Sequence, residues 1–279
     1  GVAWGTAGVF VSYLTAFGFS SEQLAFARCL TSALLGLIYL GLTKPRVLML
    51  SFRQFAFCAV SGVAFYIMAV SYYSAMKAAS VPTASVMLNM APILVILFSV
   101  LFFGERMTVP KAISIAAAVI GCALVTGVIG GLTINTQGVW YGMLSMAAYA
   151  VYSICVKLTM RQGVNPAAAT VYCFCLGSLT ALFFTHFPTF FGQVAALPLP
   201  ALAALILMGV VTGFGATFLY ARAMQGLPAG AVSAMASIEP LTSTVLSIVV
   251  LHQTLTVWSG LGIVMILLAV TVLGAQNKP

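Results

Sequence analysis

One apolar run decides the class of this protein: AGAVSAMASIEPLTSTVLSIVVL, residues 229–251. It is long enough to cross the hydrocarbon core of a bilayer, which takes about 20 apolar residues in a helix. A membrane β-barrel would instead show segments of about ten residues that alternate between apolar and polar. The run therefore predicts a transmembrane helix, with Glu239 and Pro240 near its middle.

The composition extends this prediction to the whole chain. Of its 279 residues, 62% are hydrophobic and 5% are charged, whereas soluble domains carry about 25% charged residues. We therefore predict an all-α integral membrane protein with ten transmembrane helices. The predicted spans are 2–19, 24–42, 54–74, 80–103, 110–129, 137–157, 166–186, 200–222, 229–251 and 256–275. Because the chain begins at Gly1 without Met, we expect the first helix to begin upstream.

The distribution of basic residues predicts the orientation. A net charge of +8 would suggest a nucleic-acid partner in a soluble protein, but here nearly all the cations lie in one set of loops. Loops rich in Lys and Arg face the cytoplasm. We therefore expect both termini to be cytoplasmic, in the cytoplasmic (inner) membrane of a bacterium, with no nucleic-acid partner. The other set of loops has only Lys77, and the cytoplasmic set has Lys44, Arg46, Arg53, Arg106, Lys111, Lys157, Arg161, Arg222 and Lys278.

The chain also contains an internal repeat. A shift of 148 residues aligns 72–115 with 220–263 and gives ten identities in 44 columns, where apolar composition alone would give about four or five. Pro92 and Pro240 are one of the aligned pairs. Five spans per half is an odd number, so the second half must be inverted, as in many secondary transporters. We predict two repeats, residues 1–129 and 137–275.

These motifs resemble those of a known family. The chain is similar to the EamA-domain carriers of the drug/metabolite transporter superfamily, which are made of two inverted five-helix repeats. That resemblance implies that helices one to four and six to nine surround a central cavity, with helices five and ten at the periphery, and that the cargo is a small organic solute. The matching pieces are Trp4-Gly5, Leu24-Ala25-Phe26-Ala27-Arg28, Pro92, Gly104-Glu105-Arg106 and Glu239-Pro240. The second repeat departs from this pattern with His252-Gln253-Thr254.

Glu239 is the main candidate for a functional residue. The chain has three acidic residues, and the other two, Glu22 and Glu105, fall at predicted turns. A carboxylate at this depth costs about 2.5 to 3.5 kcal/mol and must face a partner or water. It could bind a proton or a cationic substrate and so couple transport, or it could be a protonated group bonded permanently to a neighbouring helix.

Two prolines and the polar residues before them form a second group of candidates. Pro92 and Pro240 should kink their helices, because each removes a backbone hydrogen bond. Bent helices beside a cavity are where transporters collect ligand groups, so Asn89 and Ser237 are candidates for substrate binding. The alternative is that these side chains only hydrogen-bond neighbouring helices.

Aromatic side chains could complete the site by holding an amine against their rings, or they could serve packing and the membrane interface. The candidates are Trp4, Tyr66, Tyr149, Tyr152 and Tyr220. Arg28 could bind a substrate carboxylate, but we favour a side chain that snorkels to the surface or pairs with Glu22. Gly209 and Gly213 predict a close helix contact.

These features favour a secondary transporter of a small organic metabolite, an amino acid or amine exporter that works by alternating access, with protons as the candidate coupling ion. A facilitative exchanger or an importer of a quaternary amine is the alternative. A channel is less favoured, as is an intramembrane enzyme, because there is no Asp, no HExxH and no GxSxG. We expect no cofactor, no metal and no disulfide, since all six cysteines lie in spans. The partners are the substrate and the bilayer, for a monomer or a homodimer.

Overall fold

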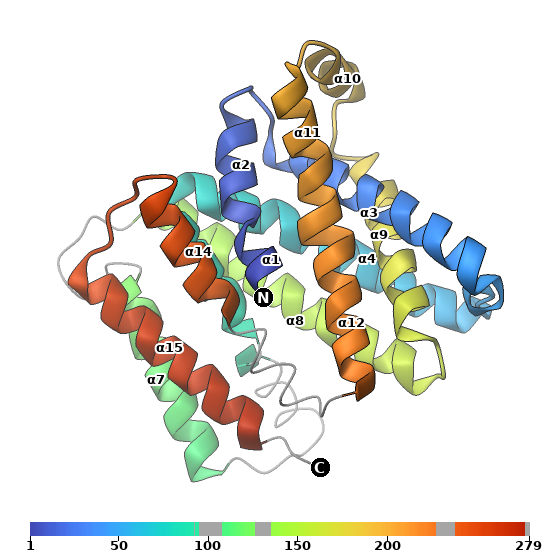
Figure 1. Ribbon diagram of the computed structural model, residues 1–279. Coiled ribbons are helices and arrows are strands. Elements are labelled where there is room, and N and C mark those ends of the chain that lie inside the picture. Colours follow the sequence, from blue (N-terminus) through green and yellow to red (C-terminus); the bar gives the residue numbers. More distant parts are fainter. Residues whose placement is uncertain (92, 95–107, 126–134, 227–237, 277–279) are drawn as a thin grey trace.

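The computed structural model describes residues 1–91, 93–94, 108–125, 135–226 and 238–276, and it is helical, without a strand in these ranges (Figure 1). The α-helices are α1 (Val2–Gly5), α2 (Ala7–Thr15), α3 (Ser21–Thr43), α4 (Phe52–Ala78), α5 (Val81–Asn89), α7 (Val109–Val125), α8 (Thr136–Arg161), α9 (Pro166–Ala181), α10 (Phe187–Ala195), α11 (Leu199–Met208), α12 (Ala216–Gly226), α14 (Ile238–Val249) and α15 (Val257–Gln276). A 3-10 turn, Pro45–Leu48, follows α3, and a π-helix, Gly209–Gly215, joins α11 to α12.

Polar residues in the turns fix where the long helices begin. The Ser20 hydroxyl accepts from the Gln23 backbone N–H, and the Gln23 side chain accepts from the Ser20 N–H, which is a capping box. Ser51 and Gln54 form the same arrangement at the start of α4. Caps of this kind satisfy backbone donors that have no partner inside the helix. The spans therefore start at positions that the sequence specifies locally.

Every predicted span contains a described helix, but the details differ. Within the described residues, four helical segments are long and apolar enough to cross a membrane: 21–43, 52–78, 136–161 and 199–220. The first predicted span is divided at Thr6 into α1 and α2. Residues 95–107 and 227–237, which belong to the fourth and ninth predicted spans, lie outside the described residues. The total of ten spans and their inverted relation therefore stay predictions.

Helix α10 was not predicted. It lies between α9 and α11, at the top of Figure 1. Its Phe187 and Phe190 rings contact Phe26 of α3 at centroid distances of 5.1 and 5.3 Å, while Phe191 is exposed. A short helix with one apolar face thus covers one end of the helix bundle.

The turns at the ends of the helices meet in two groups. In one group, the turn between α3 and α4 lies beside the turn between α8 and α9. The Gln54 side chain donates to the Gln162 carbonyl oxygen at 3.0 Å, and the Tyr172 hydroxyl donates to the Leu48 carbonyl oxygen at 2.7 Å. Lys44 and Arg46 lie in the first of these turns, and Arg53 and Arg161 lie at the helix ends beside them. All four are cations that the sequence assigned to one side.

The other group lies at the opposite ends of the same helices. The Gln193 side chain of α10 donates to the Gly18 carbonyl oxygen at 3.0 Å. The Gln253 side chain accepts from the Val81 backbone N–H, at the start of α5, at 3.3 Å. Helices α3 and α4 thus run between two separate sets of turns, as spanning helices must.

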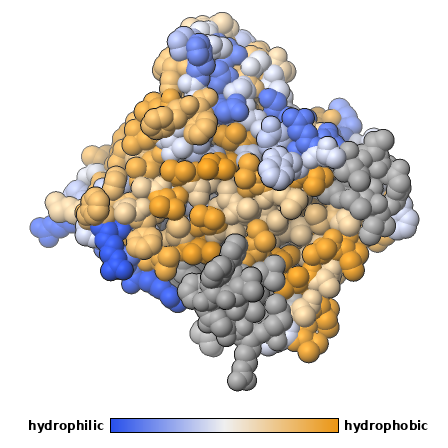
Figure 2. Space-filling model, turned by 180° about the vertical axis from the view of Figure 1, so that it is seen from behind, coloured by the Kyte–Doolittle hydropathy of each residue, from blue (hydrophilic) through white to orange (hydrophobic). Residues whose placement is uncertain are grey.

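Figure 2 shows an apolar band between these ends, with hydrophilic residues gathered at its margins. Large apolar side chains such as Leu34, Ile38 and Leu42 of α3 are exposed on the surface. Soluble monomers rarely expose apolar patches above a few hundred Å². The surface fits a multi-pass membrane protein whose helices contact lipid.

Helices α7 and α15 pack on each other at one edge of the molecule (Figure 1). They share a second apolar cluster with Val86 of α5, and its members on α7 and α15 include Ala118, Ile263 and Ile266. The resemblance implied peripheral positions for the fifth and tenth helices, and these two helices lie at the edge. The remaining helices enclose the larger cluster, with α4 in contact with α3, α5, α8 and α9.

The π-helix packs tightly against α3. A Cβ atom at Gly209 would lie 2.5 Å from the Thr31 Cβ, and one at Gly213 would overlap the Ser32 hydroxyl. The close contact predicted from these two glycines is confirmed. The wide π turn leaves carbonyl groups without the usual helical donor. The Ser32 hydroxyl donates to the Arg28 carbonyl oxygen at 2.7 Å and shares this hydrogen with the Gly209 carbonyl oxygen at 3.1 Å.

Candidate functional site

A cavity of about 240 Å³ lies among helices from both halves of the chain. Its volume is somewhat below the roughly 300 to 1,000 Å³ of pockets for drug-sized ligands, so it suits a small metabolite. Most of the lining is apolar or aromatic, with few polar groups. The lining residues are Trp4, Ala7, Arg28, Phe65, Met68, Tyr72, Leu88, Asn89, Tyr149, Tyr152, Ser153, Val156, Met160, Thr217, Tyr220 and Glu239.

Glu239 enters the cavity from the first turn of α14. The backbone of α14 lies close to α1 here, since a Cβ atom at Gly5 would lie 2.6 Å from the Thr242 Cβ and 3.0 Å from the Glu239 carbonyl oxygen. The carboxylate Oε1 accepts a hydrogen bond from the Tyr72 hydroxyl at 3.5 Å, and the Asn89 side chain lines the same cavity. The group is half-buried and therefore remains open to a ligand.

Aromatic rings form the wall around this carboxylate. The Trp4 and Tyr220 rings have centroids 5.4 Å apart. Tyr149 and Tyr152, on one face of α8, are stacked with centroids 5.8 Å apart and an interplanar angle of 19°, and Phe65 lies 5.4 Å from Tyr152. Ring faces attract cations. The wall can therefore hold either an ammonium group or a planar apolar group beside Glu239.

Arg28 is a second charged group in the cavity, and the expectation that it snorkels or pairs with Glu22 was wrong. The side chain is 6% exposed. Its Nη2 donates to the Thr212 carbonyl oxygen of the π-helix at 2.9 Å, and its Nη1 donates to the Tyr73 hydroxyl at 3.2 Å. The side chain is held inside because the π turn provides a free acceptor there.

The structure brings together most of the predicted site residues: Trp4, Asn89, Tyr149, Tyr152, Tyr220 and Glu239 line the cavity. Tyr66 does not. It is fully buried outside the cavity, with its hydroxyl 3.5 Å from the Glu22 carbonyl oxygen. Ser237 and Pro92 lie outside the described residues. Pro240 is in the first turn of the described part of α14, so its kink stays a prediction.

Several cavity residues were missed by the sequence analysis, and they are mostly apolar. Phe65 takes the place expected for Tyr66, because neighbouring residues on a helix point about 100° apart. Met68 and Tyr72 follow Phe65 at spacings of three and four, and all three line the cavity from α4. This spacing was a usable signal, since it defines one helix face.

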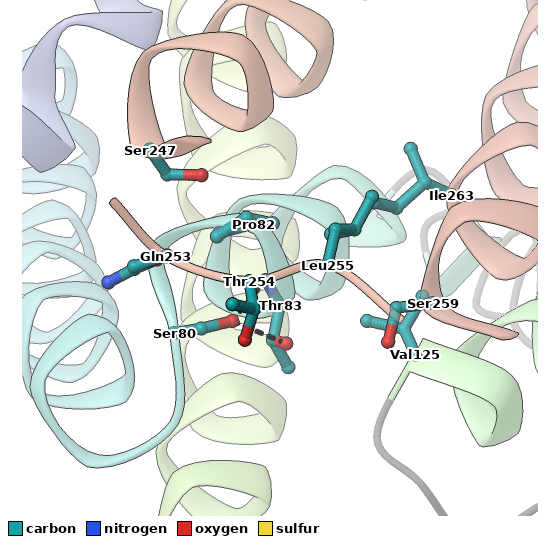
Figure 3. A pocket seen from close by; sticks show the side chains of 10 residues that line it. All are labelled: Ser80, Pro82, Thr83, Val125, Ser247, Gln253, Thr254, Leu255, Ser259 and Ile263. Carbon is teal, nitrogen blue, oxygen red and sulfur yellow. Dashed lines mark hydrogen bonds between the residues drawn. The ribbon is translucent and has the colours of Figure 1, made fainter. Parts of the chain in front are cut away.

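A second and smaller hollow lies between the start of α5, the turn after α14 and the end of α7 (Figure 3). Its volume is about 40 Å³, which is enough for about three water molecules, since one water needs about 10 to 15 Å³. The Ser80 hydroxyl donates to the Thr83 hydroxyl at 2.8 Å on its wall. This hollow is too small for an organic solute.

A helical membrane protein whose two halves together line a mostly apolar cavity with a few polar groups has the architecture of a solute carrier. Residues 1–127 and 136–275 match the EamA-like transporter family, so the chain belongs to this family. The predicted membership of the drug/metabolite transporter group is confirmed. The family is one of membrane transporters and not of enzymes.

Curated relatives agree with this membership. The chain is 25% identical over 172 residues to a probable terminal-alkyne amino-acid exporter of Streptantibioticus cattleyicolor, covering 62% of this chain and 55% of that protein. It is 25% identical to the uncharacterized transporter YxxF of Bacillus subtilis, over 92% of this chain and 83% of the relative. An uncharacterized transporter of Archaeoglobus fulgidus is 30% identical, over 72% of this chain and 70% of its own. The chain spans about half the length of the first of these relatives.

One crystal structure aligns with 99% of this chain and 95% of its own chain, with a TM-score of 0.64 and 19% identity. At this identity the likeness concerns the fold alone. It supports the helical arrangement described above.

Proposed function

We propose that this protein is a secondary transporter that exports a small organic metabolite, an amino acid or an amine, across the cytoplasmic membrane by alternating access. The observation that carries the proposal is the cavity between the two halves, in which one carboxylate, Glu239, faces a wall of aromatic rings. A site at the junction of two repeats can be opened to either side by rocking one half against the other. The similarity to an amino-acid exporter supports the cargo class.

Protons are the proposed coupling ion. An ammonium group and a proton would compete for the Glu239 carboxylate, and competition for one group makes a carrier exchange one ligand for the other. Among the described residues, Glu239 is the only acidic one in the cavity lining, and the sequence has no P-loop for ATP. Exchange of an outgoing substrate for an incoming proton would therefore drive export.

The proposed orientation places both termini in the cytoplasm. One set of predicted loops has nine cations and the other set has one, and the positive-inside rule therefore places the first set in the cytoplasm. It is also supported by the contacts between the turns at 44–52 and 162–166, which gather basic residues at one end of the bundle.

Counterflow in proteoliposomes tests the function. Vesicles that contain the purified protein are preloaded with unlabelled L-phenylalanine, phenethylamine or choline at millimolar concentration, and the uptake of the same compound, labelled and at trace concentration, is followed. A carrier of amino acids or amines should give a transient accumulation of label that protein-free vesicles lack, whereas a channel only equilibrates it. Counterflow of choline alone would favour the alternative of quaternary amine exchange or import. No counterflow of any of the three compounds would contradict the proposal.

A further inference from the structure

Arg28 gives the cavity a positive charge, which has no role in the proton exchange proposed for Glu239. It comes from α3, in the first half of the chain, whereas Glu239 comes from α14, in the second half. Both side chains line the same cavity, but neither forms an ion pair with any residue that the structure describes. The cavity therefore has a positive pole, Arg28, and a negative pole, Glu239, and these two charges are not paired with each other.

The Arg28 guanidinium has donors to spare. It has five N–H donors, and its hydrogen bonds to Tyr73 and Thr212 use two of them. Its Nε is buried and has no hydrogen-bond partner among the described residues. The Phe65 ring lies below the group, 5.4 Å from its central carbon. The guanidinium is thus held in a fixed plane while donors remain free, which is the arrangement that binds a carboxylate with two parallel hydrogen bonds.

The sum of charges decides the kind of cargo. The described lining has one cation and one anion, so a ligand without net charge leaves the site neutral. A simple amine would neutralise Glu239 and leave Arg28 uncompensated, and a simple carboxylate would do the reverse. An uncompensated charge is costly in a poorly hydrated cavity. A ligand that carries both groups is the one that compensates both poles.

We propose that Arg28 is the carboxylate-binding residue of the substrate site, so that the cargo is an α-amino acid zwitterion whose ammonium group faces Glu239 and whose side chain lies against the aromatic wall. This inference rests on the proposed transport function and narrows its substrate class from amino acids and amines to amino acids. Because it assigns the two ends of the ligand to two halves of the chain, it also predicts that each end is sensed by a different residue.

Binding of three matched compounds tests the assignment. L-Phenylalanine carries both charges, phenethylamine lacks the carboxylate, and 3-phenylpropionate lacks the ammonium group, while all three have the same ring. Their dissociation constants can be measured by titration calorimetry on the purified protein, with thermal shift as a second reading. The wild type should bind L-phenylalanine about tenfold to hundredfold more tightly than either of the other two, as expected for one charge-assisted bidentate contact.

Two substitutions at Arg28 separate binding from structure. Arg28→Gln should weaken the binding of L-phenylalanine about tenfold to hundredfold and change the affinity for phenethylamine by no more than about threefold. The two compounds should then bind with similar affinity. Arg28→Lys keeps the positive charge but lacks the planar pair of N–H donors of a guanidinium group, so it should retain part of the preference for L-phenylalanine over phenethylamine. The matched control is Ser32→Ala, because Ser32 holds the same π-helix through Gly209 without lining the cavity. It should leave the ratio between the compounds unchanged.

The outcomes separate the inference from the function on which it rests. Equal affinities of the wild type for L-phenylalanine and phenethylamine would overturn the inference. An equal loss of affinity for both ligands in Arg28→Lys would overturn it as well. In either case amine transport, and with it the proposed function, would stand. If Arg28→Gln does not fold, the wild-type panel and Arg28→Lys still decide. No binding and no counterflow of any compound by the wild type would instead contradict the proposed function.

Discussion

Replacing Glu239 with Gln is the most informative change for the proposed coupling, because the substitution keeps the shape and the hydrogen bonds of the side chain but cannot bind a proton. The part of the cavity lining that the structure describes contains no other carboxylate, and the chain has no Asp and only two other acidic residues. One carboxylate implies one proton per cycle. A proton gradient of one pH unit stores about 1.4 kcal/mol, and one proton exchanged per substrate can therefore concentrate the substrate about tenfold.

The assay uses proteoliposomes with an acidic lumen at pH 6.5 in a medium at pH 7.5, with the membrane potential clamped to zero by potassium and valinomycin. Protons that leave should drive labelled substrate inward. The wild type should reach about a tenfold ratio of internal to external substrate, which nigericin abolishes. Glu239→Gln should reach a ratio of about one, because its exchange no longer requires a proton.

Two controls make the result specific. Counterflow without a pH gradient should remain detectable in Glu239→Gln when it is measured at a higher substrate concentration, because the ammonium group has lost its carboxylate partner. This result would show that the variant is folded and still cycles. Tyr72→Phe removes the hydroxyl that donates to the carboxylate at 3.5 Å and leaves the carboxyl group in place, so it should retain the concentration ratio. A wild-type ratio and pH profile in Glu239→Gln would refute the reasoning, and a ratio near a hundredfold in the wild type would require a second proton site.

Three further predictions concern the fold and the wall of the cavity. Gly213→Ala should lower the free energy of unfolding by about 1 to 3 kcal/mol, because its methyl group overlaps the Ser32 hydroxyl. Reversible denaturation in detergent measures this change. The control Gly41→Ala has open space and lies in a helix, where Ala is favoured over Gly, so it should not lower the free energy of unfolding. A Gly213→Ala variant as stable as the wild type would contradict the tight packing. In a background without the native cysteines, Gly192→Cys should react with an impermeant thiol reagent only from outside the cell, and Arg161→Cys should react only from inside. The reverse pattern would contradict the proposed orientation with both termini in the cytoplasm. Trp4→Leu and Tyr220→Leu should each weaken phenethylamine binding about twofold to thirtyfold, because each removes a ring beside the ammonium group. The control Trp140→Leu changes a residue that is 65% exposed and lies outside the cavity, so it should leave phenethylamine binding unchanged. Equal effects of all three substitutions would show that the aromatic wall does not bind the ligand.

The sequence predicted the helices well because length, apolarity and turn chemistry act locally. Runs near 20 residues and caps such as Ser20 and Ser51 depend on a few neighbouring residues. Helix α10 was missed for the same reason. Its nine residues are too few for a span, and its apolar face is completed only by Phe26 from a distant part of the chain.

The cavity was predicted only in part because its lining depends on the rotation of each helix. Sequence could place Tyr66 on a helix near the cavity but could not decide between Tyr66 and its neighbour Phe65, which point in directions about 100° apart. Glu239 was easier, since a lone carboxylate deep in an apolar helix has few stable places other than a cavity.

Arg28 shows what the sequence alone could not provide. It lies seven residues after the first residue of α3, a depth of about 10 Å at 1.5 Å per residue, and a long side chain at that depth can either reach back to the surface or turn inward. The choice depends on the Thr212 carbonyl, which is free only because α11 and α12 are joined by a π-helix. That π-helix in turn needs Gly213 to approach α3. Local rules of helix geometry and charge burial are thus broken at neighbouring points around one cavity, as is expected where a protein gives up local stability for a binding site.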